Sequence, residues 1–171
     1  MIKRNITPQE IDILGPFIAE LTGVVLDHSK AYLFETRLGP ILDKYELENF
    51  TSLIQGIALN RNIECDTIDA ITTQETLFFR DKHPFEFLQN KFLPDFFKRK
   101  GKDAPLNIWS AASSTGQEIC SIAMTLHNSF CDMSKVRLTG TDISEDALNK
   151  ARNGFYKQFE IDAMHGYVLL I

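Results

Sequence analysis

The segment that most constrains the fold is WSAASSTGQE at residues 109–118, where an apolar stretch gives way to small residues and then to a helical pattern. The apolar residues from Leu106 predict a buried strand, and the small side chains predict a tight turn into a helix. A second short apolar stretch over residues 136–141 predicts another strand, with Asp142 at its end. Strands that alternate with helices favour a parallel sheet, and such a sheet binds nucleotide-like ligands at the carboxyl ends of its strands.

The residues before this segment show helical patterns. Residues 7–10, TPQE, form a capping box with proline at the first helical position, and Gly23 is suited to end that helix. Further helices are expected to begin near Ser29, Phe50, Asp66 and Asp81, the last of them ending at Pro94. This part of the chain is therefore predicted to be all-α.

A change in composition separates the two parts. Residues 98–105, KRKGKDAP, are basic, contain glycine and proline, and lack large apolar side chains, which is typical of a linker or surface loop. The predicted organisation is a helical domain over residues 1–97, a linker over 98–105 and an incomplete Rossmann-like α/β domain over 106–171. Only two strands are clear, and Tyr167–Ile171 offers a third. A half-sheet exposes an apolar edge and faces, which favours association.

Composition excludes several classes of protein. The net charge of −5 argues against nucleic-acid binding as the main task. No apolar stretch reaches the roughly 18 residues that span a membrane, and the N-terminus lacks the apolar core of a secretory signal. The cysteines Cys65, Cys120 and Cys131 are widely spaced, so reduced thiols in a cytoplasmic protein are expected. The histidines show no metal-ligand spacing, so no metal site is predicted, and no catalytic nucleophile–base pair can be recognised.

Three charged residues are candidates for ligand binding. Asp142 at the strand end can accept both hydrogen bonds of a ribose diol, although on its own an N-cap or a solvated turn acid explains that position better. Together with the first turn, the two explanations are about even. Glu118, in the first turn of a helix, can stabilise the helix dipole or bind a cationic amine. Arg80, which follows two phenylalanines, can be a surface charge beside the core, or its planar fork can hold a carboxylate.

In this order, the segments resemble one family, the CheR-type chemotaxis-receptor glutamate methyltransferases, from about Phe17 to Ile161. TGVVLDHSKAYLFETRL is similar to the family's pattern of TG, then K, then RL, and TTQETLFFRD is similar to its threonine–FFR signature. WSAASSTGQE resembles its WSA-x-x-STGEE turn, and TGTDISEDALNKARNGFY resembles its second strand and following helix. The resemblance implies a small all-α N-terminal domain followed by an incomplete Rossmann-like domain of the class I methyltransferase type.

The resemblance also implies S-adenosylmethionine as the cofactor, with S-adenosylhomocysteine as the product. Gln74, Thr76, Arg80, Glu118 and Asp142 fall on family positions that contact the cofactor. Arg80 is expected at the methionyl carboxylate, Glu118 near the methionyl amine and ribose, and Asp142 at the ribose hydroxyls. Gln74 stands where the family usually has asparagine, and its longer amide can still reach the cofactor.

Basic residues of the N-terminal domain meet acidic receptor helices in this family, and Lys30 and Arg37 occupy the matching positions. The expected function is methylation of glutamate side chains on chemotaxis receptors or related signalling proteins, impaired in a chain of this length. The alternative is a non-catalytic receptor- or partner-binding module that pairs as a homodimer through the half-sheet. Neither nucleic-acid binding nor membrane insertion is expected.

Overall fold

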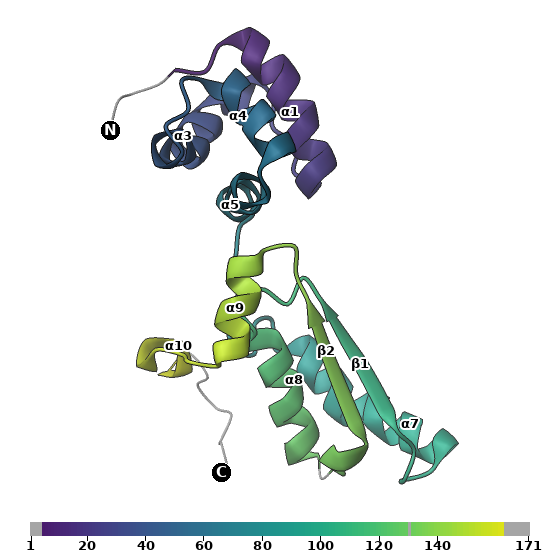
Figure 1. The fold of residues 1–171 in the computed structure, drawn as a ribbon. Helices are drawn as coiled ribbons and strands as arrows, with labels where there is room; N and C mark the ends of the chain where they lie inside the picture. The colour runs from purple at the N-terminus through teal and green to yellow at the C-terminus, as the bar shows by residue number, and fades with distance from the viewer. Residues whose placement is uncertain (1–4, 130, 163–171) are drawn as a thin grey trace. The chain divides into compact units, whose positions relative to one another are not determined.

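A computed structural model describes residues 5–129 and 131–162 of the chain, and its elements are drawn in Figure 1. The chain divides into two compact units. The first comprises the described residues up to Thr73 together with Ile143–Glu145, and the second comprises Gln74–Asp142 and the described residues from Asp146 onward. No helix within the described ranges has both the length and the hydropathy to cross a bilayer.

The first unit is helical, as predicted. Its elements are α1 (Pro8–Thr22), the short 3₁₀ segment η1 (His28–Lys30), α2 (Ala31–Leu33), the π-helical segment η2 (Phe34–Leu38), α3 (Gly39–Lys44), α4 (Phe50–Leu59) and α5 (Arg61–Ile71).

The predicted boundaries of α1 are confirmed. The Thr7 hydroxyl accepts a hydrogen bond from the backbone N–H of Glu10, and the Glu10 carboxylate accepts one from the backbone N–H of Thr7, which completes the capping box. The helix ends at Gly23, whose φ of +76° is the left-handed conformation that glycine adopts without a steric penalty. Local signals at both ends therefore define this helix.

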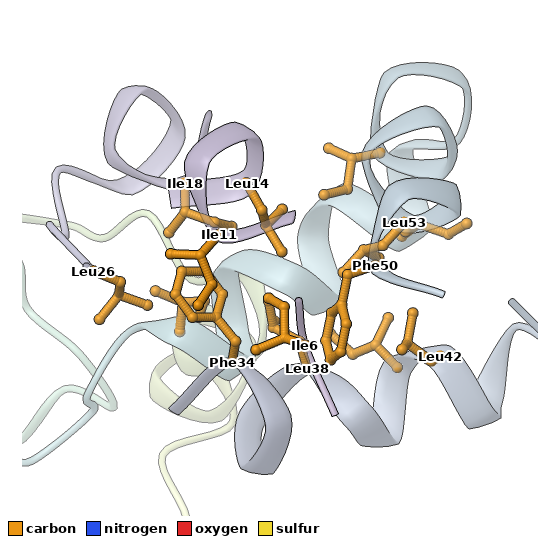
Figure 2. Close-up of a cluster of buried hydrophobic side chains, with 14 residues drawn as sticks. Ile6, Ile11, Leu14, Ile18, Leu26, Phe34, Leu38, Leu42, Phe50 and Leu53 are labelled. Atoms are coloured by element: carbon orange, nitrogen blue, oxygen red, sulfur yellow. The ribbon is translucent and has the colours of Figure 1, made fainter. Parts of the chain in front are cut away.

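The core of the first unit is formed by the apolar faces of α1, η2, α3 and α4. Figure 2 shows these side chains converging on one another from the different helices. Leu14, Phe34, Leu42 and Leu53, one from each of these segments, have no exposed surface. Two isoleucines of α5 belong to the same buried cluster. Burial of such side chains supplies most of the stability of a helical unit of this size.

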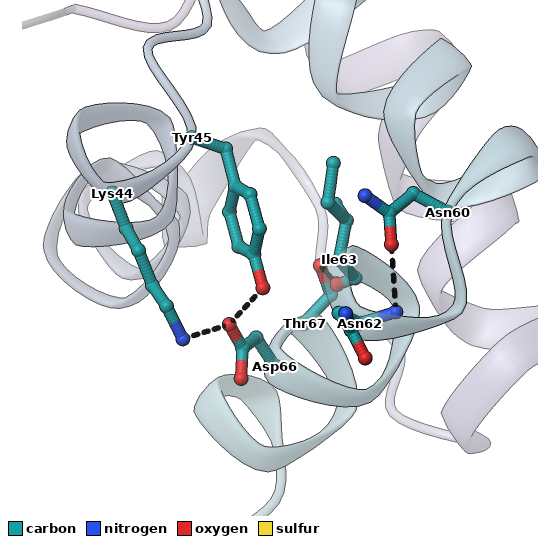
Figure 3. A network of polar contacts seen from close by, with 7 residues as sticks. All are labelled: Lys44, Tyr45, Asn60, Asn62, Ile63, Asp66 and Thr67. Atoms are coloured by element: carbon teal, nitrogen blue, oxygen red, sulfur yellow. Dashed lines mark hydrogen bonds and ion pairs between the residues drawn. The ribbon is translucent and has the colours of Figure 1, made fainter.

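The prediction that Asp66 caps a helix is wrong. Asn60 caps α5 by accepting a hydrogen bond from the N–H of Asn62, and Asp66 lies in the middle of the helix. Its carboxylate accepts hydrogen bonds from Lys44 Nζ at 2.5 Å and from Tyr45 Oη at 2.7 Å, as Figure 3 shows. The acid joins α5 to the end of α3, a tertiary role that a capping pattern in the sequence does not reveal.

The carboxylate of Glu10 joins the start of α1 to the start of α4. One oxygen accepts from Thr7, and the other accepts from the backbone N–H groups of Phe50 at 3.0 Å and Thr51 at 3.3 Å. Burial raises the pKa of Glu10, but the hydrogen bonds from these residues outweigh that effect and lower the pKa below its usual 4.5. A lowered pKa contributes stability that is present above the unfolded-state pKa and is lost as the pH falls through the folded-state value.

Replacing Glu10 by glutamine is therefore expected to reduce the acid sensitivity of the first unit. The variant should be less stable than the wild type near neutral pH, and the difference should shrink as the pH falls through the lowered folded-state pKa of Glu10. Urea unfolding followed by circular dichroism across this range measures the difference. Glu20→Gln, an exposed acid on the same helix, is the control, and a Glu10→Gln difference that stays constant with pH contradicts the prediction.

The second unit contains the predicted parallel sheet and its helices. Its elements are α6 (His83–Phe87), the π-helical segment η3 (Leu88–Phe92), α7 (Leu93–Lys100), β1 (Leu106–Ala111), α8 (Gln117–Asn128), the 3₁₀ segment η4 (Met133–Lys135), β2 (Val136–Thr141), α9 (Glu145–Asn153) and α10 (Gln158–Asp162).

The strands β1 and β2 run parallel, with Leu106 opposite Val136 and Ala111 opposite Thr141. The side chains that alternate inward on β1 pack against α8 and the α7 region, whereas the other face of the strand is exposed. Trp109 on that face is 69% exposed. Parallel sheets are usually covered on both faces. In this sheet, the described residues cover only one face. The third strand predicted at Tyr167–Ile171 lies outside the described residues.

The chain divides earlier than the sequence predicts. The basic residues Lys98–Lys100, predicted to begin a linker, form the last turn of α7. Pro94, predicted to end the preceding helix, lies in the first turn of α7, which follows η3 without a break. Leu93 packs with Leu106 and Leu126, so the helices before β1 share a core with the sheet. The boundary between the compact units accordingly falls after Thr73 and not at residue 97.

Candidate functional site

The turn between β1 and α8 is compact and conformationally specialised. Ala112, Ser114 and Gly116 all have positive φ angles, of +58°, +48° and +96°. Ser113 N–H donates to the carbonyl of Thr141 at 2.9 Å, which fastens the turn to the end of β2. Small residues tolerate this left-handed backbone better than branched ones do, and this explains the run of alanine and serine in the sequence.

Two serines orient the two candidate acids, one at the end of β1 and one in the turn that follows it. The backbone N–H of Ser114 donates to Oδ2 of Asp142 at 2.7 Å. The hydroxyl of Ser110 donates to Oε1 of Glu118 at 2.8 Å. Each acid is therefore bound by a serine near the carboxyl ends of the two strands. Both acids could be recognised in the sequence as candidate binding residues, but no sequence pattern identified the two serines that bind them.

Gln74 and Thr76 lie in the irregular segment that precedes α6. The hydroxyl of Ser114 donates to the carbonyl of Gln74 at 3.4 Å, which brings Gln74 to the same turn that contacts Asp142. Thr76 is half-buried two residues further along this segment. The structure thus places Gln74 and Asp142 on a shared neighbour, Ser114.

Arg80 and Glu118 line one cavity of about 530 Å³. Its walls are otherwise mainly apolar and include Phe85, Trp109 and Ile122. The guanidinium of Arg80 donates to the carbonyl of Glu75 at 2.8 Å, which positions it at the rim. A cation and an anion on the wall of one largely apolar cavity suit a ligand that carries both an acidic and a basic group.

Asp142 lies in a second cavity, of about 450 Å³, with Ser113, Gly140 and Leu148 among its walls. The candidate residues therefore form two groups, Arg80 with Glu118 and Gln74 with Asp142. The end of β1 and the turn that follows it, residues 110–116, contact both groups.

A buried serine on α8 anchors the segment that leads to Arg80. The backbone N–H of Phe79 donates to Ser121 Oγ at 2.9 Å, and this hydroxyl donates to the carbonyl of Gln117 at 2.7 Å. Ser121 has no exposed surface. In the sequence, only the position of Ser121 on the apolar face of a predicted helix could have indicated this contact.

The two basic residues expected to meet a partner lie in the first unit. Arg37 Nη1 donates to the carbonyl of Ile71 at 2.7 Å, so this guanidinium is engaged in holding the end of α5. Lys30 is exposed, with its Nζ at 3.5 Å from the carbonyl of Val25. Both side chains line a cavity of about 200 Å³ whose other walls are mainly aliphatic.

Within residues 5–129 and 131–162, no three His, Cys, Asp or Glu side chains lie close enough to share a metal ion. The arrangement instead offers acceptors for hydroxyls at a strand end and an arginine–glutamate pair at a cavity. A helical region followed by a parallel strand–turn–helix–strand unit of this kind is a partial class I methyltransferase α/β fold.

The family model described as CheR methyltransferase, SAM binding domain, matches residues 74–169. The chain belongs to the CheR methyltransferase family. The match begins within one residue of the boundary between the two compact units, so the matched region and the second unit start together.

Full-length relatives support the assignment. A chemotaxis protein methyltransferase of Vibrio parahaemolyticus is 40% identical over 158 residues, which cover 89% of this chain and 56% of the relative. One from Borreliella burgdorferi is 35% identical over 173 residues, covering 96% of this chain and 60% of the relative. Chemotaxis protein methyltransferase 1 of Pseudomonas aeruginosa is 34% identical over 153 residues, with 86% and 56% covered. The chain therefore spans little more than half the length of these relatives.

Proposed function

We propose that this protein takes part in the S-adenosylmethionine-dependent methylation of glutamate side chains on chemotaxis receptors or related cytoplasmic signalling proteins. The observation that supports the proposal most strongly is that Arg80 and Glu118 line the same cavity, while the turn after β1 binds Asp142. The names of the relatives, all chemotaxis protein methyltransferases, point to the same activity.

The residues present fit the chemical groups of the cofactor. Arg80 can hold the methionyl carboxylate through its planar fork, and Glu118 can accept the methionyl ammonium. Asp142, which the N–H of Ser114 holds at the end of β2, is a carboxylate, and a carboxylate is a suitable acceptor for the hydroxyls of a ribose. The apolar walls of the Arg80–Glu118 cavity suit the hydrocarbon part of the same ligand.

Bound S-adenosylmethionine supplies a methyl group that its positively charged sulfur already activates. A glutamate carboxylate is itself a nucleophile, so the main task of the protein is to position the cofactor and the carboxylate relative to each other, and acid–base catalysis is less important. In this proposal Arg80 and Glu118 fix the amino-acid end of the cofactor, and Asp142 fixes the ribose. The receptor would meet the first unit, where the exposed Lys30 offers a positive charge to acidic helices.

A non-catalytic binding module is the second candidate function. The exposed outer face of the sheet, with Trp109 at 69% exposure, favours it because an uncovered sheet face promotes association. Light scattering coupled to size-exclusion chromatography measures the oligomeric state, which tests the homodimer that this second candidate requires. A strict monomer that binds the cofactor counts against a homodimer formed through the half-sheet.

Calorimetric titration of this chain with S-adenosylhomocysteine tests the proposed function directly. Saturable binding that NAD does not compete with is the expected result. Absence of binding, in this chain and in a version extended to the length of its relatives, would refute the cofactor assignment. Binding only by the extended version would place the complete site outside this chain.

Replacing Asp142 by asparagine is expected to weaken S-adenosylhomocysteine binding about tenfold, because a charged acceptor for the ribose diol becomes a neutral amide. The amide oxygen can still accept from Ser114, so the turn should keep its structure. Asp146→Asn is a matched control, since Asp146 is an acid of α9 that pairs with Lys150 at 2.6 Å. Equal affinities for the two variants would contradict the assigned role of Asp142.

A further inference from the structure

Tyr156, between α9 and α10, contacts three segments that are far apart in the sequence. Its hydroxyl donates to the carbonyl of Thr115 in the turn at 3.0 Å. Its ring meets Phe78 edge to face, with 4.9 Å between the ring centroids and an interplanar angle of 76°. The Sγ of Cys120 on α8 lies 3.7 Å from the hydroxyl. One side chain thus joins the turn, α8 and the segment that leads to Arg80.

Gly116 is required for this contact. A Cβ at this position would lie 2.8 Å from Tyr156 Oη and 3.0 Å from the Cβ of Ala151. Its φ of +96° is also a conformation that other residues rarely adopt. At Gly116 the space that a side chain would need is occupied by Tyr156 and by Ala151 of α9.

The hydroxyl of Tyr156 is a proton donor throughout the physiological pH range. Burial raises the pKa of Tyr156, and the neighbouring Cys120 and Glu160 raise it further. The phenol therefore stays neutral, and its bond to the Thr115 carbonyl is always available.

We propose that Tyr156 is a positioning residue that fixes the turn at residues 110–116 relative to the Phe78–Arg80 segment. The turn orients Glu118 and Asp142, and Phe78 lies two residues before Arg80. Tyr156 thus keeps the two acids and Arg80 in fixed positions relative to one another, so that a single ligand can contact all three. This inference rests on the proposed cofactor function, because the alignment matters only if one ligand contacts both groups.

The contacts divide the role of the side chain into two parts. The ring packs in an apolar cluster with Phe78, Phe79 and Phe85, which stabilises the unit irrespective of the hydroxyl. The hydroxyl alone reaches the turn. Tyr156→Phe keeps the ring and removes the bond to Thr115 together with the contact to Cys120 Sγ, so it tests positioning without emptying the core.

Two measurements on the full chain test the proposal. In calorimetry, Tyr156→Phe is expected to weaken S-adenosylhomocysteine binding about three- to tenfold, with little change in the unfolding temperature. In hydrogen exchange without ligand, the amides of residues 110–118 should exchange faster in the variant, while those of α7 stay unchanged. Tyr32→Phe, at a tyrosine that is 60% exposed in the other compact unit, is the control for the same chemical change.

The outcomes separate this inference from the proposed function. If neither the wild-type chain nor its extended version binds S-adenosylhomocysteine, the proposed function fails, and the proposal that Tyr156 aligns one ligand fails with it whatever the exchange data show. If only the extended version binds, the Tyr156→Phe comparison is made in that version. If the wild type binds but Tyr156→Phe exchanges at the wild-type rate in residues 110–118, the positioning role alone is overturned. Faster exchange with unchanged affinity, or loss of protection spread through α7 and α8, also overturns it, because Tyr156 would then be a structural residue only.

Discussion

Replacing Phe34 by alanine is expected to lower the free energy of unfolding of the first unit by about 3–5 kcal/mol. Phe34 lies in η2, has no exposed surface and belongs to the cluster that joins α1 with α4. Removing the ring loses its burial and leaves a cavity that neighbours such as Leu14 and Ile18 cannot fill without moving the helices that carry them. Urea unfolding followed by circular dichroism measures the change.

Tyr32→Ala is the matched control for this prediction. Tyr32 is an aromatic residue two positions before Phe34, and its side chain is 60% exposed. Its removal should change the free energy of unfolding by less than about 1 kcal/mol. If Phe34→Ala cost no more than Tyr32→Ala, the arrangement of η2 against α1 and α4 in Figure 2 would be incorrect.

The secondary structure that could be predicted from the sequence is the part whose signals are local. The Thr7–Glu10 capping box and Gly23 define α1, and alternation of apolar residues defines β1 and β2. Asp66 was misassigned because an acid before apolar residues resembles a helix cap. In the structure its carboxylate instead accepts bonds from Lys44 and Tyr45, more than twenty positions earlier.

The candidate site shows the same division between local and long-range information. Glu118 and Asp142 could be selected because strand ends and helix starts are readable from the sequence. Ser114 contacts Asp142 across 28 positions, and Tyr156 contacts Thr115 across 41. Such contacts depend on how β1 and β2 align and on where the chain passes after α9, and neither is encoded in a local pattern. The extent of the second unit was missed for a related reason, since the packing of Leu93 on β1 and α8 is tertiary.

Replacing Arg80 by glutamine is expected to weaken S-adenosylhomocysteine binding by about 10- to 100-fold, the largest effect on binding among the variants considered. A guanidinium can donate two parallel hydrogen bonds to a carboxylate and also neutralises its charge, whereas an amide offers a single neutral donor group. Arg80 is already fastened to the Glu75 carbonyl at 2.8 Å, so little side-chain freedom has to be lost on binding. Calorimetric titration of the variant with S-adenosylhomocysteine gives the change in affinity.

Two comparisons determine whether the fork of Arg80 or merely its charge is responsible. Arg80→Lys keeps the positive charge without the planar fork, so its affinity should lie between those of the wild type and Arg80→Gln. Arg99→Gln makes the same substitution at an exposed arginine of α7, which donates to the carbonyl of Asp95 in its own helix, and it should leave binding unchanged. Equal affinities for Arg80→Lys and Arg80→Gln would assign the effect to geometry alone. Wild-type affinity in Arg80→Gln would instead place the methionyl carboxylate away from Arg80, and the pairing of Arg80 with Glu118 would then no longer support the cofactor site.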